Sequence, residues 1–392
     1  MRPLPISAYT VTSALGAGRA AHLHALRSGA TGLRKLAFDT NTLDCWLGEV
    51  EGLGNALTGE SARWDCRNNR LAALALRQDG FEDSVRRCRD RYGAARVGVF
   101  IGTSTSGVHH TEIAYRERDA STNALPDWFD HRHTQNIFSV ADFVAAWLGL
   151  AGPAFAISTA CSSSAKVFAA ASRAIAAGAC DAAVVGGVDS LCLTTLHGFN
   201  SLQLVSADIC RPADAARNGI SIGEAGGFAL LEPDAGTPVR LIGYGESSDA
   251  YHMSSPEPDG RGAIASMQAA LARGGVEPHQ VDYINLHGTG TVANDNAEAR
   301  GVCTVFGAGT PCSSTKGWTG HTLGAAGIVE SAISLLAIEH GFLPRSLNTR
   351  SKDPAIEAGI LLESRNGSVD RVLSNSFGFG GSNCSLLFGK TP

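Results

Sequence analysis

Runs of apolar residues alternate along the chain with segments whose small and apolar residues recur at helical spacing. The first buried strand is predicted at residues 96–102. A helix is predicted at residues 139–150, and a short apolar strand at Ala154–Ile157 leads into a second helix that ends near Gly178. Another strand is predicted at residues 182–188. This alternation is typical of an α/β fold, with helices packed on a buried, largely parallel sheet.

The second half of the chain repeats this order. A strand at residues 283–286 leads into a turn rich in glycine and threonine, and a helix rich in small residues follows at residues 323–339. The repeat predicts an internal duplication with a boundary near residues 231–244. We therefore assign residues 1–240 to an N-terminal half and residues 241–392 to a C-terminal half.

The composition is that of a folded, globular chain. Hydrophobic residues make up 44% of the 392 residues and charged residues 18%, so there are enough apolar side chains to build a core. The net charge of -5 and the pI of about 6.2 argue against bulk nucleic-acid binding. The longest apolar run, residues 143–157, contains glycine and proline and is too short to span a bilayer. The N-terminal residues lack the apolar region of a signal peptide, so we expect a cytoplasmic protein without membrane insertion.

Glycine and cysteine are the two residue types that stand out in the composition. The 46 glycines show no G-X-Y period and indicate many tight turns and close backbone approaches. The 10 cysteines include no C-x-x-C pair and no Cys/His spacing that suits zinc, so we expect no metal site of that kind and no disulfide framework. Most of them are expected to be buried structural thiols in a reducing compartment.

Cys161 differs from the other cysteines in its position. It lies where the strand at Ala154–Ile157 turns into a helix, and it is flanked by Ala160 and Ser162. A thiol at a helix N-terminus is exposed to the positive end of the helix dipole and to free backbone N–H groups, both of which favour the thiolate. The small neighbours leave room for a substrate. A buried structural thiol is the alternative for any single cysteine, and the position favours a nucleophile here.

Three ionisable residues of the second half lie in sharp turns: His287, Lys316 and His321. His287 ends a strand inside a Gly/Thr loop, whereas a core histidine sits more often on an apolar helix face. His321 is predicted to open a helix, where the dipole lowers its pKa and keeps the ring neutral. Lys316 would lower the pKa of His321 further by like-charge repulsion. It would also pair with Glu330, a carboxylate in the helix that His321 opens. Each residue could instead be a satisfied polar group, and their coincidence with Cys161 is what favours a site.

A glycine-rich segment at residues 375–383 lies between two apolar stretches. One interpretation is an ordinary hairpin turn. The other is a mobile flap with an aromatic gate and free backbone N–H groups, which the glycines would allow to swing. A phosphate-cradling loop is disfavoured because neither the Walker spacing nor a strand-to-helix context is present.

Four motifs, in this order, carry a family resemblance that covers essentially the whole chain. STACSSSAK begins at Ser158, HGTGTVANDNAEA at His287, STKGWTGHTLGAAGIVES at Ser314 and NSFGFGGSN at Asn375. The stretch CRPADAARNGISIGEAGGFALLE from Cys210 fits the same family. Together they resemble the β-ketoacyl-acyl carrier protein synthases of the thiolase superfamily, of the elongating type. The resemblance implies the thiolase fold, a five-layered αβαβα sandwich of two duplicated halves.

The resemblance also implies an acyltransferase that performs a decarboxylative Claisen condensation with malonyl-acyl carrier protein and gives 3-oxoacyl-acyl carrier protein, in fatty acid or polyene synthesis. Cys161 would be the nucleophile that holds the acyl chain as a thioester. His287 and His321 would bind the malonyl thioester carbonyl and stabilise the enolate formed on decarboxylation. Lys316, with Glu330, would organise His321 and the local field.

Further roles follow from the same resemblance. The backbone N–H group of Phe379 would complete an oxyanion hole with that of the nucleophile, and its ring would be the gate. Thr289 and Thr291 would hydrogen-bond the phosphopantetheine arm, and Phe377 would line the substrate site. Thr105 would lie at the floor of the acyl pocket. Its turn of small hydroxylated residues resembles that of synthases from aryl polyene clusters and suggests a pocket shaped for a chain other than a saturated fatty acyl group.

An acidic acyl carrier protein is the expected partner, so a local basic patch is expected despite the negative net charge. The candidate patch comprises Arg63, Arg67 and Arg70, with Arg132 and Arg211 as additions. A solvated helix face is the alternative for each of these arginines. The resemblance implies a homodimer and leaves open a heterodimer with a related synthase.

No cofactor is expected besides the phosphopantetheine carried by the partner, although a monovalent cation near Asn296 and Glu330 is compatible with the resemblance. Two alternative functions stay open. A thiolase-type condensing enzyme would pair the cysteine with His and Asn, or with His and a second Cys, whereas the second-half motifs here give two histidines. A chain-length-factor-like subunit, which is non-catalytic and only shapes the tunnel of a heterodimer, usually lacks the nucleophile, and Cys161 argues against it.

Overall fold

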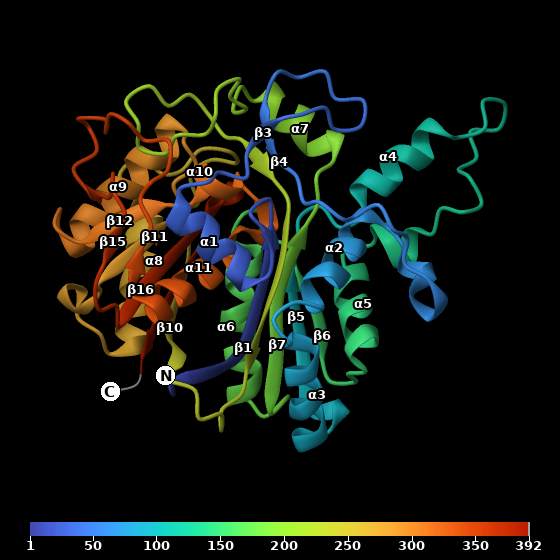
Figure 1. Ribbon diagram of the computed structural model, residues 1–392, viewed down its shortest axis with the longest axis horizontal. Coiled ribbons are helices and arrows are strands. Elements are labelled where there is room, and N and C mark those ends of the chain that lie inside the picture. The colour runs from blue at the N-terminus through green and yellow to red at the C-terminus, as the bar shows by residue number, and fades with distance from the viewer. Residues whose placement is uncertain (391–392) are drawn as a thin grey trace.

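Two groups of strands form the centre of the computed structural model, which describes residues 1–390 (Figure 1). The N-terminal group comprises β1 (Leu4–Ser13), β5 (Val97–Gly102), β6 (Ala154–Ile157), β7 (Ala182–Asp189) and β9 (Ala225–Leu231). The C-terminal group comprises β10 (Val239–Ser248), β11 (Tyr283–Leu286), β12 (Pro311–Ser314), β14 (Gly359–Ile360), β16 (Arg371–Gly378) and β17 (Ser382–Lys390). The strand order is β14-β12-β11-β16-β17-β10-β1-β9-β7-β5-β6. The groups meet at β1 and β10, where Leu4 pairs with Leu241 and Pro5 with Arg240.

Strand pairing follows the same scheme in both groups. In the N-terminal group, β5 pairs parallel with β6 and β7, and β9 pairs antiparallel with β7 and β1. In the C-terminal group, β11 pairs parallel with β12 and β16, and β17 pairs antiparallel with β16 and β10. The shared topology is that of a duplicated α/β fold, as predicted. The division between residues 240 and 241 stays a prediction, and β10 itself begins at Val239.

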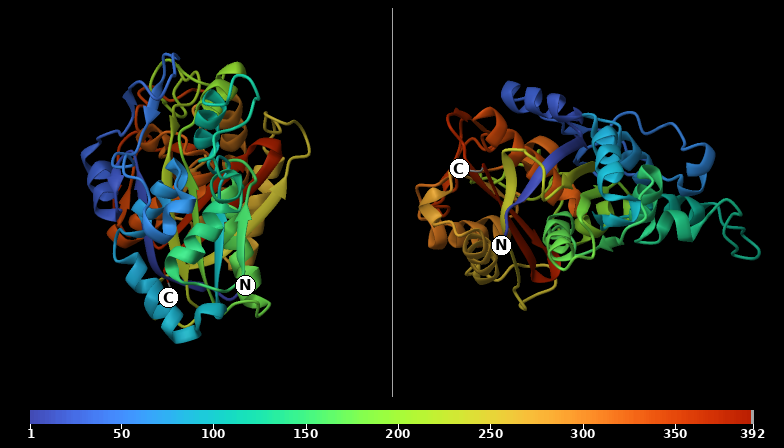
Figure 2. Two further views of the ribbon diagram at one scale, coloured as in Figure 1. Left: turned by 90° about the vertical axis from the view of Figure 1, so that its right-hand side faces the viewer. Right: turned by 90° about the horizontal axis from the view of Figure 1, so that it is seen from below.

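Helices lie between the two groups of strands and on both outer faces (Figure 2). In the middle, α11 (Ala326–His340) packs against β16 and β17, against β1 and β9, and against α6 (Ser163–Ala176). On the outside, α2 (Arg67–Leu76), α3 (Phe81–Tyr92) and α5 (Ser139–Leu148) cover the N-terminal strands. On the other side, α8 (Arg261–Gly274) packs on β10 and β17, with α9 (Val292–Phe306) beside it. The layers alternate helix, sheet, helix, sheet, helix, which is the predicted five-layered sandwich.

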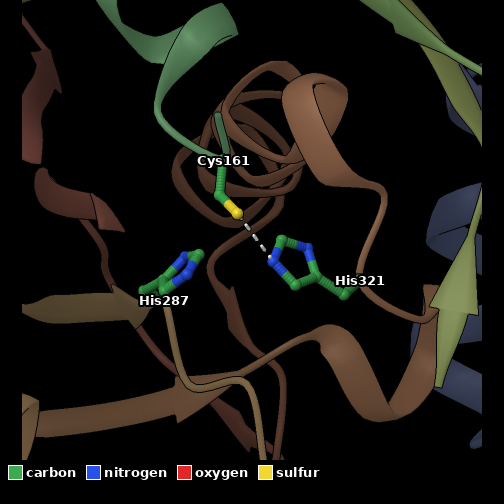
Figure 3. Close-up of side chains that lie close together, drawn as sticks. All are labelled: Cys161, His287 and His321. Carbon is green, nitrogen blue, oxygen red and sulfur yellow. Dashed lines mark hydrogen bonds between the residues drawn. The ribbon is translucent and has the colours of Figure 1, made fainter. Parts of the chain in front are cut away.

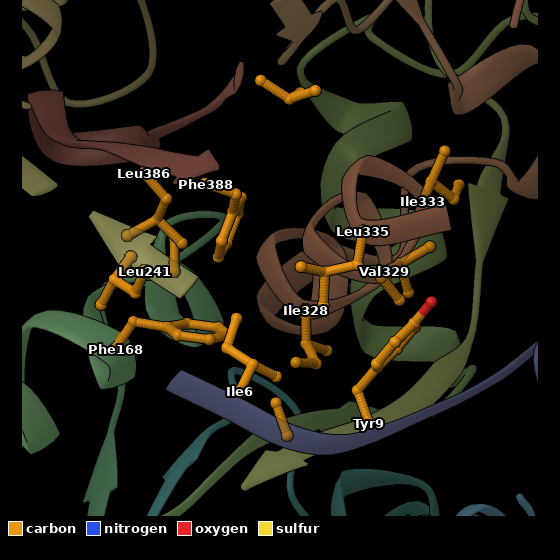
Figure 4. Close-up of a cluster of buried hydrophobic side chains, with 14 of the residues drawn as sticks. Ile6, Tyr9, Phe168, Leu241, Ile328, Val329, Ile333, Leu335, Leu386 and Phe388 are labelled. Atoms are coloured by element: carbon orange, nitrogen blue, oxygen red, sulfur yellow. The ribbon is translucent and has the colours of Figure 1, made fainter. Parts of the chain in front are cut away.

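The central layer holds a large apolar cluster (Figure 4). Ile328 and Val329 of α11 belong to the same cluster as Ile6 and Tyr9 of β1, and the ring of Phe168 lies 5.7 Å from that of Phe388. The segment Leu323–His340 is long and apolar enough to cross a membrane, but 89% of it is buried inside the protein. Packing between the two sheets therefore explains its hydrophobicity.

The predicted elements match the structure closely, with one-residue shifts at the start of β5 and the end of β7 and three larger differences. The helix predicted at residues 139–150 ends at Leu148, because Gly149 adopts a left-handed conformation with φ 64°. The helix predicted at residues 323–339 is divided into the 3-10 turn η5 (Leu323–Ala325) and α11. The loop predicted at residues 375–383 is wrong in extent, because β16 and β17 leave only η6 (Phe379–Gly381) between them. The hairpin interpretation of this segment is therefore confirmed.

The remaining elements are short or peripheral. The other helices are α1 (Arg19–Ser28), α4 (Val108–Arg116), α7 (Leu193–Ser201) and α10 (Lys316–Thr319). The other strands are β2 (Gly16–Ala17), β3 (Arg34–Lys35), β4 (Trp46–Gly48), β8 (Ile222–Gly223), β13 (Phe342–Leu343) and β15 (Arg365–Asn366). Among them, α4 and the loop that follows it project from the N-terminal half (Figure 1).

Candidate active site

Cys161 lies in a sharp turn between β6 and α6. Ala160 has a φ of 52°, in the left-handed region that a residue with a side chain rarely adopts. This turn places the thiol two residues before the first residue of α6, Ser163, and leaves Cys161 only 5% exposed. The turn directs the thiol toward two histidines of the C-terminal half (Figure 3). The predicted position at a strand-to-helix junction is confirmed.

The Cys161 thiol is protonated at neutral pH, contrary to the expectation that the helix N-terminus favours the thiolate. Burial raises its pKa to about 11, although the charge of Lys316 and the N–H group of Phe379 act in the opposite direction. The carboxylates of Asp189 and Glu330 add to the increase. Burial is the largest influence on this thiol, so the protonated form is favoured at pH 7.

His321 contacts both the nucleophile and a backbone donor. Its Nε2 atom lies 3.1 Å from Cys161 Sγ, and its Nδ1 atom accepts a hydrogen bond from Leu323 N–H at 3.2 Å. A backbone N–H can only donate, so Nδ1 is unprotonated and the ring proton resides on Nε2. Burial lowers the pKa of His321 well below its usual value, and the Lys316 charge lowers it further. The ring is neutral, as predicted, but burial is the main cause rather than the helix dipole.

His287 lies on the other side of Cys161, at the end of β11 (Figure 3). Its ring is 5.3 Å from that of His321, at an interplanar angle of 82°. Burial lowers its pKa well below the usual value, followed by the charge of Lys316. Lys316 Nζ lies 3.4 Å from His287 Nδ1, which makes Nδ1 the acceptor and leaves the proton on Nε2. Both imidazoles are therefore neutral N–H donors.

Lys316 and Glu330 form a buried ion pair, as predicted, with exposed side-chain fractions of 1% and 3%. Burial raises the pKa of Glu330 to about 7, opposed by the Lys316 charge. Lys316 also donates to the carbonyl oxygen of His287 at 2.5 Å. The pair thus contacts His287 through Lys316, whereas the sequence analysis predicted that it organises His321. Its effect on His321 is through charge.

A pocket opens at Cys161, and seven of the ten predicted site residues line it, the exceptions being Lys316, Glu330 and Thr105. Thr289 and Thr291 share a hydrogen bond between their hydroxyls at 2.9 Å, and both face this pocket. The ring of Phe377 lies 6.0 Å from that of His287. The structure adds pocket-lining residues that the sequence did not suggest: Phe199, Leu204, Ile220, Ser254, Ser255 and Pro256. For the last three, the Ser-Ser-Pro sequence indicated a turn.

Phe379 lies at the tip of the β16–β17 hairpin and lines the pocket. Its N–H group is close enough to Cys161 to lower the pKa of the thiol, and its ring lies 5.5 Å from that of Phe199. Gly380 follows with a φ of 79° and donates to the carbonyl of Met253 at 2.8 Å. The geometry is compatible with the predicted oxyanion hole and gate, and both roles stay predictions.

Thr105 lies apart from the pocket-lining residues. It is 1% exposed, and its hydroxyl donates to Asp189 at 3.1 Å and accepts from the N–H of Ser190 at 3.2 Å. Its predicted place at the floor of an acyl pocket stays a prediction.

Three of the five arginines in the candidate basic patch form ion pairs within the protein. Arg67 is paired with the buried Glu224 and with Glu49, and Arg70 is paired with Asp65. Arg211 is likewise paired with Asp208. The patch predicted from sequence therefore reduces to Arg63 and Arg132, both of which are exposed.

The surroundings of Glu330 differ from those suggested for a cation. The side-chain oxygen of Asn296 accepts a hydrogen bond from Arg217, which is also paired with Asp295 and Asp353. Asn285 is the neighbour of Glu330, because its amide donates to the Glu330 carbonyl oxygen at 3.2 Å. Asn285 Oδ1 and Glu330 Oε2 are both buried without a hydrogen-bond partner among residues 1–390.

Cys161, His287 and His321 also lie close enough to share a metal ion. The ammonium group of Lys316 is 3.4 Å from His287 and would repel a cation at this position. A thiol between two neutral imidazole donors is instead suited to acyl transfer and to binding a carbonyl oxygen on which negative charge develops.

Comparison with known proteins identifies the family. Residues 66–236 match the model "Beta-ketoacyl synthase, N-terminal domain", and residues 239–350 match "Beta-ketoacyl synthase, C-terminal domain". The chain belongs to the β-ketoacyl synthase family. It is 41% identical over 316 residues to the mitochondrial 3-oxoacyl-[acyl-carrier-protein] synthase of Arabidopsis thaliana, covering 75% of this chain and 68% of that protein. This synthase is 38% identical to 3-oxoacyl-[acyl-carrier-protein] synthase 2 of Rhizobium meliloti, over 74% of this chain and 73% of that protein.

Solved structures extend the similarity to the whole synthase. A chain in the complex of the ketosynthase ApeO with its chain length factor ApeC, from Xenorhabdus doucetiae, has a TM-score of 0.91 and 39% identity, covering 100% of this chain and 98% of that one. The ishigamide ketosynthase/chain length factor has a TM-score of 0.89 and 27% identity, with full coverage of both chains. The synthase is thus an acyltransferase of the condensing type with the thiolase fold.

Proposed function

We propose that this synthase transfers an acyl group from a carrier protein to Cys161 and condenses it with malonyl-carrier protein to give a 3-oxoacyl-carrier protein. The observation that carries the proposal is the contact between the Cys161 thiol and His321, with His287 beside them in one pocket. Loading of Cys161 exchanges one thioester for another, and the carrier leaves as a free thiol. The developing oxyanion would lie between the N–H groups of Cys161 and Phe379.

The second step uses the two histidines. Loss of carbon dioxide from the malonyl thioester leaves an enolate, and its oxygen needs neutral N–H donors, which stabilise the negative charge without transferring a proton to it. His287 and His321 fit this need because both rings are neutral, with Nδ1 held by Lys316 and by Leu323 N–H respectively. The enolate carbon then attacks the acyl thioester on Cys161, the new carbon–carbon bond forms, and the cysteine leaves as the thiol after protonation.

The substrate class we favour is the unsaturated, aryl-primed chain of aryl polyene synthesis. The similarity to the ApeO complex over the whole chain supports this choice, as does the Thr103-to-Ser106 turn of small hydroxylated residues. Saturated fatty acyl chains are the second candidate, supported by the curated relatives. Mass-spectrometric comparison of Cys161 loading by saturated, unsaturated and aryl-primed acyl-carrier proteins tests the choice, and preferential loading of the saturated group would contradict it.

A dimer of this synthase is supported by the edge of the N-terminal sheet. β6 is the last strand in the order, and its Phe155 is 51% exposed. Tyr115, Trp128 and Phe138, in α4 and the segment that follows it, are also exposed aromatic residues. We favour a heterodimer with a related chain-length-factor subunit, in line with the ApeO complex, over a homodimer. Light scattering of the purified chain alone tests this: a stable homodimer would contradict it.

The acidic carrier protein would dock near Arg63 and Arg132. Arg63 lies over the Trp64 ring at 5.2 Å, and Trp64 contacts the ring of His133, next to Arg132, at 5.6 Å. These contacts bring the two exposed arginines to one region. Replacing both arginines with glutamate is expected to raise KM for acyl-carrier protein. The rate of acyl loading from a small thioester without a carrier protein should not change.

A structural monovalent cation fits the residues around Glu330 better than those around Asn296. Asn285 Oδ1 and Glu330 Oε2 are buried oxygens without hydrogen bonds among residues 1–390, the Asn285 amide donates to the Glu330 backbone carbonyl, and oxygen ligands suit such an ion. Asn296 is occupied by Arg217. The ion would lie on the Oε2 side of Glu330, whose Oε1 is paired with Lys316, and exchange of K⁺ for a large organic cation would lower the thermal stability.

The two alternative functions have less support. A non-catalytic chain-length-factor role would leave no use for the contact between Cys161 and His321. A thiolase-type enzyme would pair the cysteine with His and Asn, or with His and a second Cys, whereas Cys161 shares its pocket with two histidines, His287 and His321.

A further inference from the structure

Asp189 is a fully buried carboxylate at the end of β7, and the condensation has no direct use for it. It is 0% exposed, and among residues 1–390 no lysine, arginine or histidine forms an ion pair with it. Instead, both of its oxygens accept hydrogen bonds from two segments that lie far apart in the sequence. One is the turn after β5, and the other is η5, which follows His321.

The two oxygens of Asp189 have different partners. Oδ1 accepts from the hydroxyl of Thr103 at 2.7 Å and from the N–H groups of Ser104 and Thr105 at 2.7 and 3.0 Å. Oδ2 accepts from the hydroxyl of Ser104 and from the N–H group of Gly324 at 2.6 Å. The carboxylate thus ties the start of η5 to the end of β5.

Residue 324 has to be glycine for this contact. A Cβ atom there would lie 2.8 Å from Asp189 Oδ2 and 2.7 Å from the nitrogen of Ser104. The preceding residue, Leu323, has a φ of 52°, a conformation that costs energy for a residue with a side chain. Such a conformation persists only where the surroundings hold it in place, and the hydrogen bond from Gly324 to Asp189 does so on one side.

The strained residue is also the one that fixes the His321 ring. Leu323 N–H donates to His321 Nδ1 at 3.2 Å, and the next N–H along the chain, that of Gly324, donates to Asp189. Two successive N–H groups therefore connect the imidazole and the carboxylate. If the turn relaxed, Nδ1 would lose its donor, and the proton could move from Nε2 to Nδ1, leaving no donor toward the substrate.

We propose that Asp189 is a positioning residue that holds the turn at residues 323–324 against His321 and so keeps the imidazole proton on Nε2, facing Cys161 and the enolate. The inference rests on the proposed function, because it assigns His321 the task of donating to the enolate in malonyl decarboxylation. It predicts that decarboxylation depends on Asp189 more strongly than acyl loading of Cys161 does.

The test compares two rates in each variant: loading of Cys161, followed by intact-protein mass, and release of carbon dioxide from malonyl-carrier protein. In Asp189→Asn the amide can present an oxygen to only one of the two sides. With that oxygen facing Ser104 and Thr105, the NH₂ group faces Gly324 N–H and the tie is lost. We expect decarboxylation to fall about 100-fold and loading to fall less than about tenfold, the scale of losing one preorganised donor.

Two milder variants form a matched pair. Ser104→Ala removes a hydroxyl from the Oδ2 side at an exposed position, so that the fold is expected to tolerate it. Thr103→Val removes a hydroxyl from the Oδ1 side and leaves the Gly324 contact in place. Ser104→Ala should lower the ratio of decarboxylation to loading severalfold, whereas Thr103→Val should lower both rates in proportion or neither. If Asp189→Asn does not fold, the ratio of decarboxylation to loading in these two variants tests the proposal.

A spectroscopic measurement reads the tautomer itself. In histidine-¹⁵N-labelled synthase, the His321 signals, assigned by comparison with His321→Gln, should show an unprotonated Nδ1 in the parent protein and a protonated share in Ser104→Ala. An unchanged ratio and unchanged signals in Asp189→Asn and Ser104→Ala would overturn the proposal. A fall in the ratio of decarboxylation to loading in Thr103→Val as large as that in Ser104→Ala would overturn it too. A parent protein that neither loads Cys161 nor decarboxylates malonyl-carrier protein would instead contradict the proposed function.

Discussion

His321 Nε2 lies 3.1 Å from Cys161 Sγ, and the thiol in this contact is protonated at neutral pH. Because burial raises the pKa of Cys161 to about 11, reactivity that requires the thiolate should be low at pH 7.

The first prediction concerns this reactivity. Alkylation of Cys161 by iodoacetamide should rise about tenfold per pH unit from pH 7 toward pH 10, because the thiolate fraction rises in that proportion below the pKa. Peptide mass spectrometry of Cys161 measures the rate. In Lys316→Met the rate at a given pH should be lower, because the lysine charge lowers the pKa of Cys161. A plateau already reached below pH 8 would show that the thiol is ionised in the resting protein.

The second prediction separates the roles of His321. His321→Ala should leave acyl loading largely intact and suppress malonyl decarboxylation by about 100- to 1000-fold, the effect of losing one donor to a developing oxyanion. Loading is followed by mass and decarboxylation by carbon dioxide release, with His287→Ala as the parallel variant. Equal loss of both steps in His321→Ala would mean that the histidine acts on the Cys161 thiol instead.

The third prediction concerns the buried ion pair of Lys316 and Glu330. Glu330→Ala leaves the lysine charge buried without a partner and should lower the free energy of unfolding by about 3–5 kcal/mol. Replacing both residues, in Lys316→Met with Glu330→Leu, should restore much of that stability while activity stays lost, because His287 no longer has its donor at Nδ1. Urea unfolding of the three proteins tests this. A double variant less stable than Glu330→Ala would refute it.

The fourth prediction concerns substrate binding by the threonine pair. Thr289→Val removes a hydroxyl from the pocket while keeping the side-chain shape, and it should raise KM for carrier-bound substrates about tenfold with little change in kcat. Thr291 is less suited to this test, because its hydroxyl also accepts from Asn294 N–H at the start of α9. Thr289→Ser, which keeps the hydroxyl, is the control. A fall in kcat at constant KM would point to a role in the chemical steps.

Much of the fold could be predicted because its buried strands are short apolar runs with clear ends. The strands at Ala154–Ile157 and Tyr283–Leu286 have the predicted bounds. The hairpin at residues 375–383 was harder, since Asn375 and Ser376 are polar yet lie within β16. Asn375 is buried and bonds to Glu298 and Ser385, partners that no local pattern reveals.

Cys161 and the two histidines were recognisable because they lie in turns or at the ends of elements, but their pKa values could not be predicted from the sequence. The pKa of Cys161 is raised mainly by burial, which the strand-to-helix junction visible in the sequence does not reveal. The predicted basic patch lost Arg67 for a similar reason, because its carboxylate partner, Glu224, is 157 residues away in the chain. Long-range partners of this kind become visible only in the fold.

The most direct measurement is the mass of the protein after incubation with an acyl-carrier protein. The parent synthase should gain the mass of one acyl group on Cys161, and Cys161→Ala should gain none, although the other nine cysteines remain. Cys210→Ala, which replaces a buried thiol outside the pocket, should load like the parent. An acyl group that still adds to Cys161→Ala through another cysteine would contradict the assignment of the nucleophile.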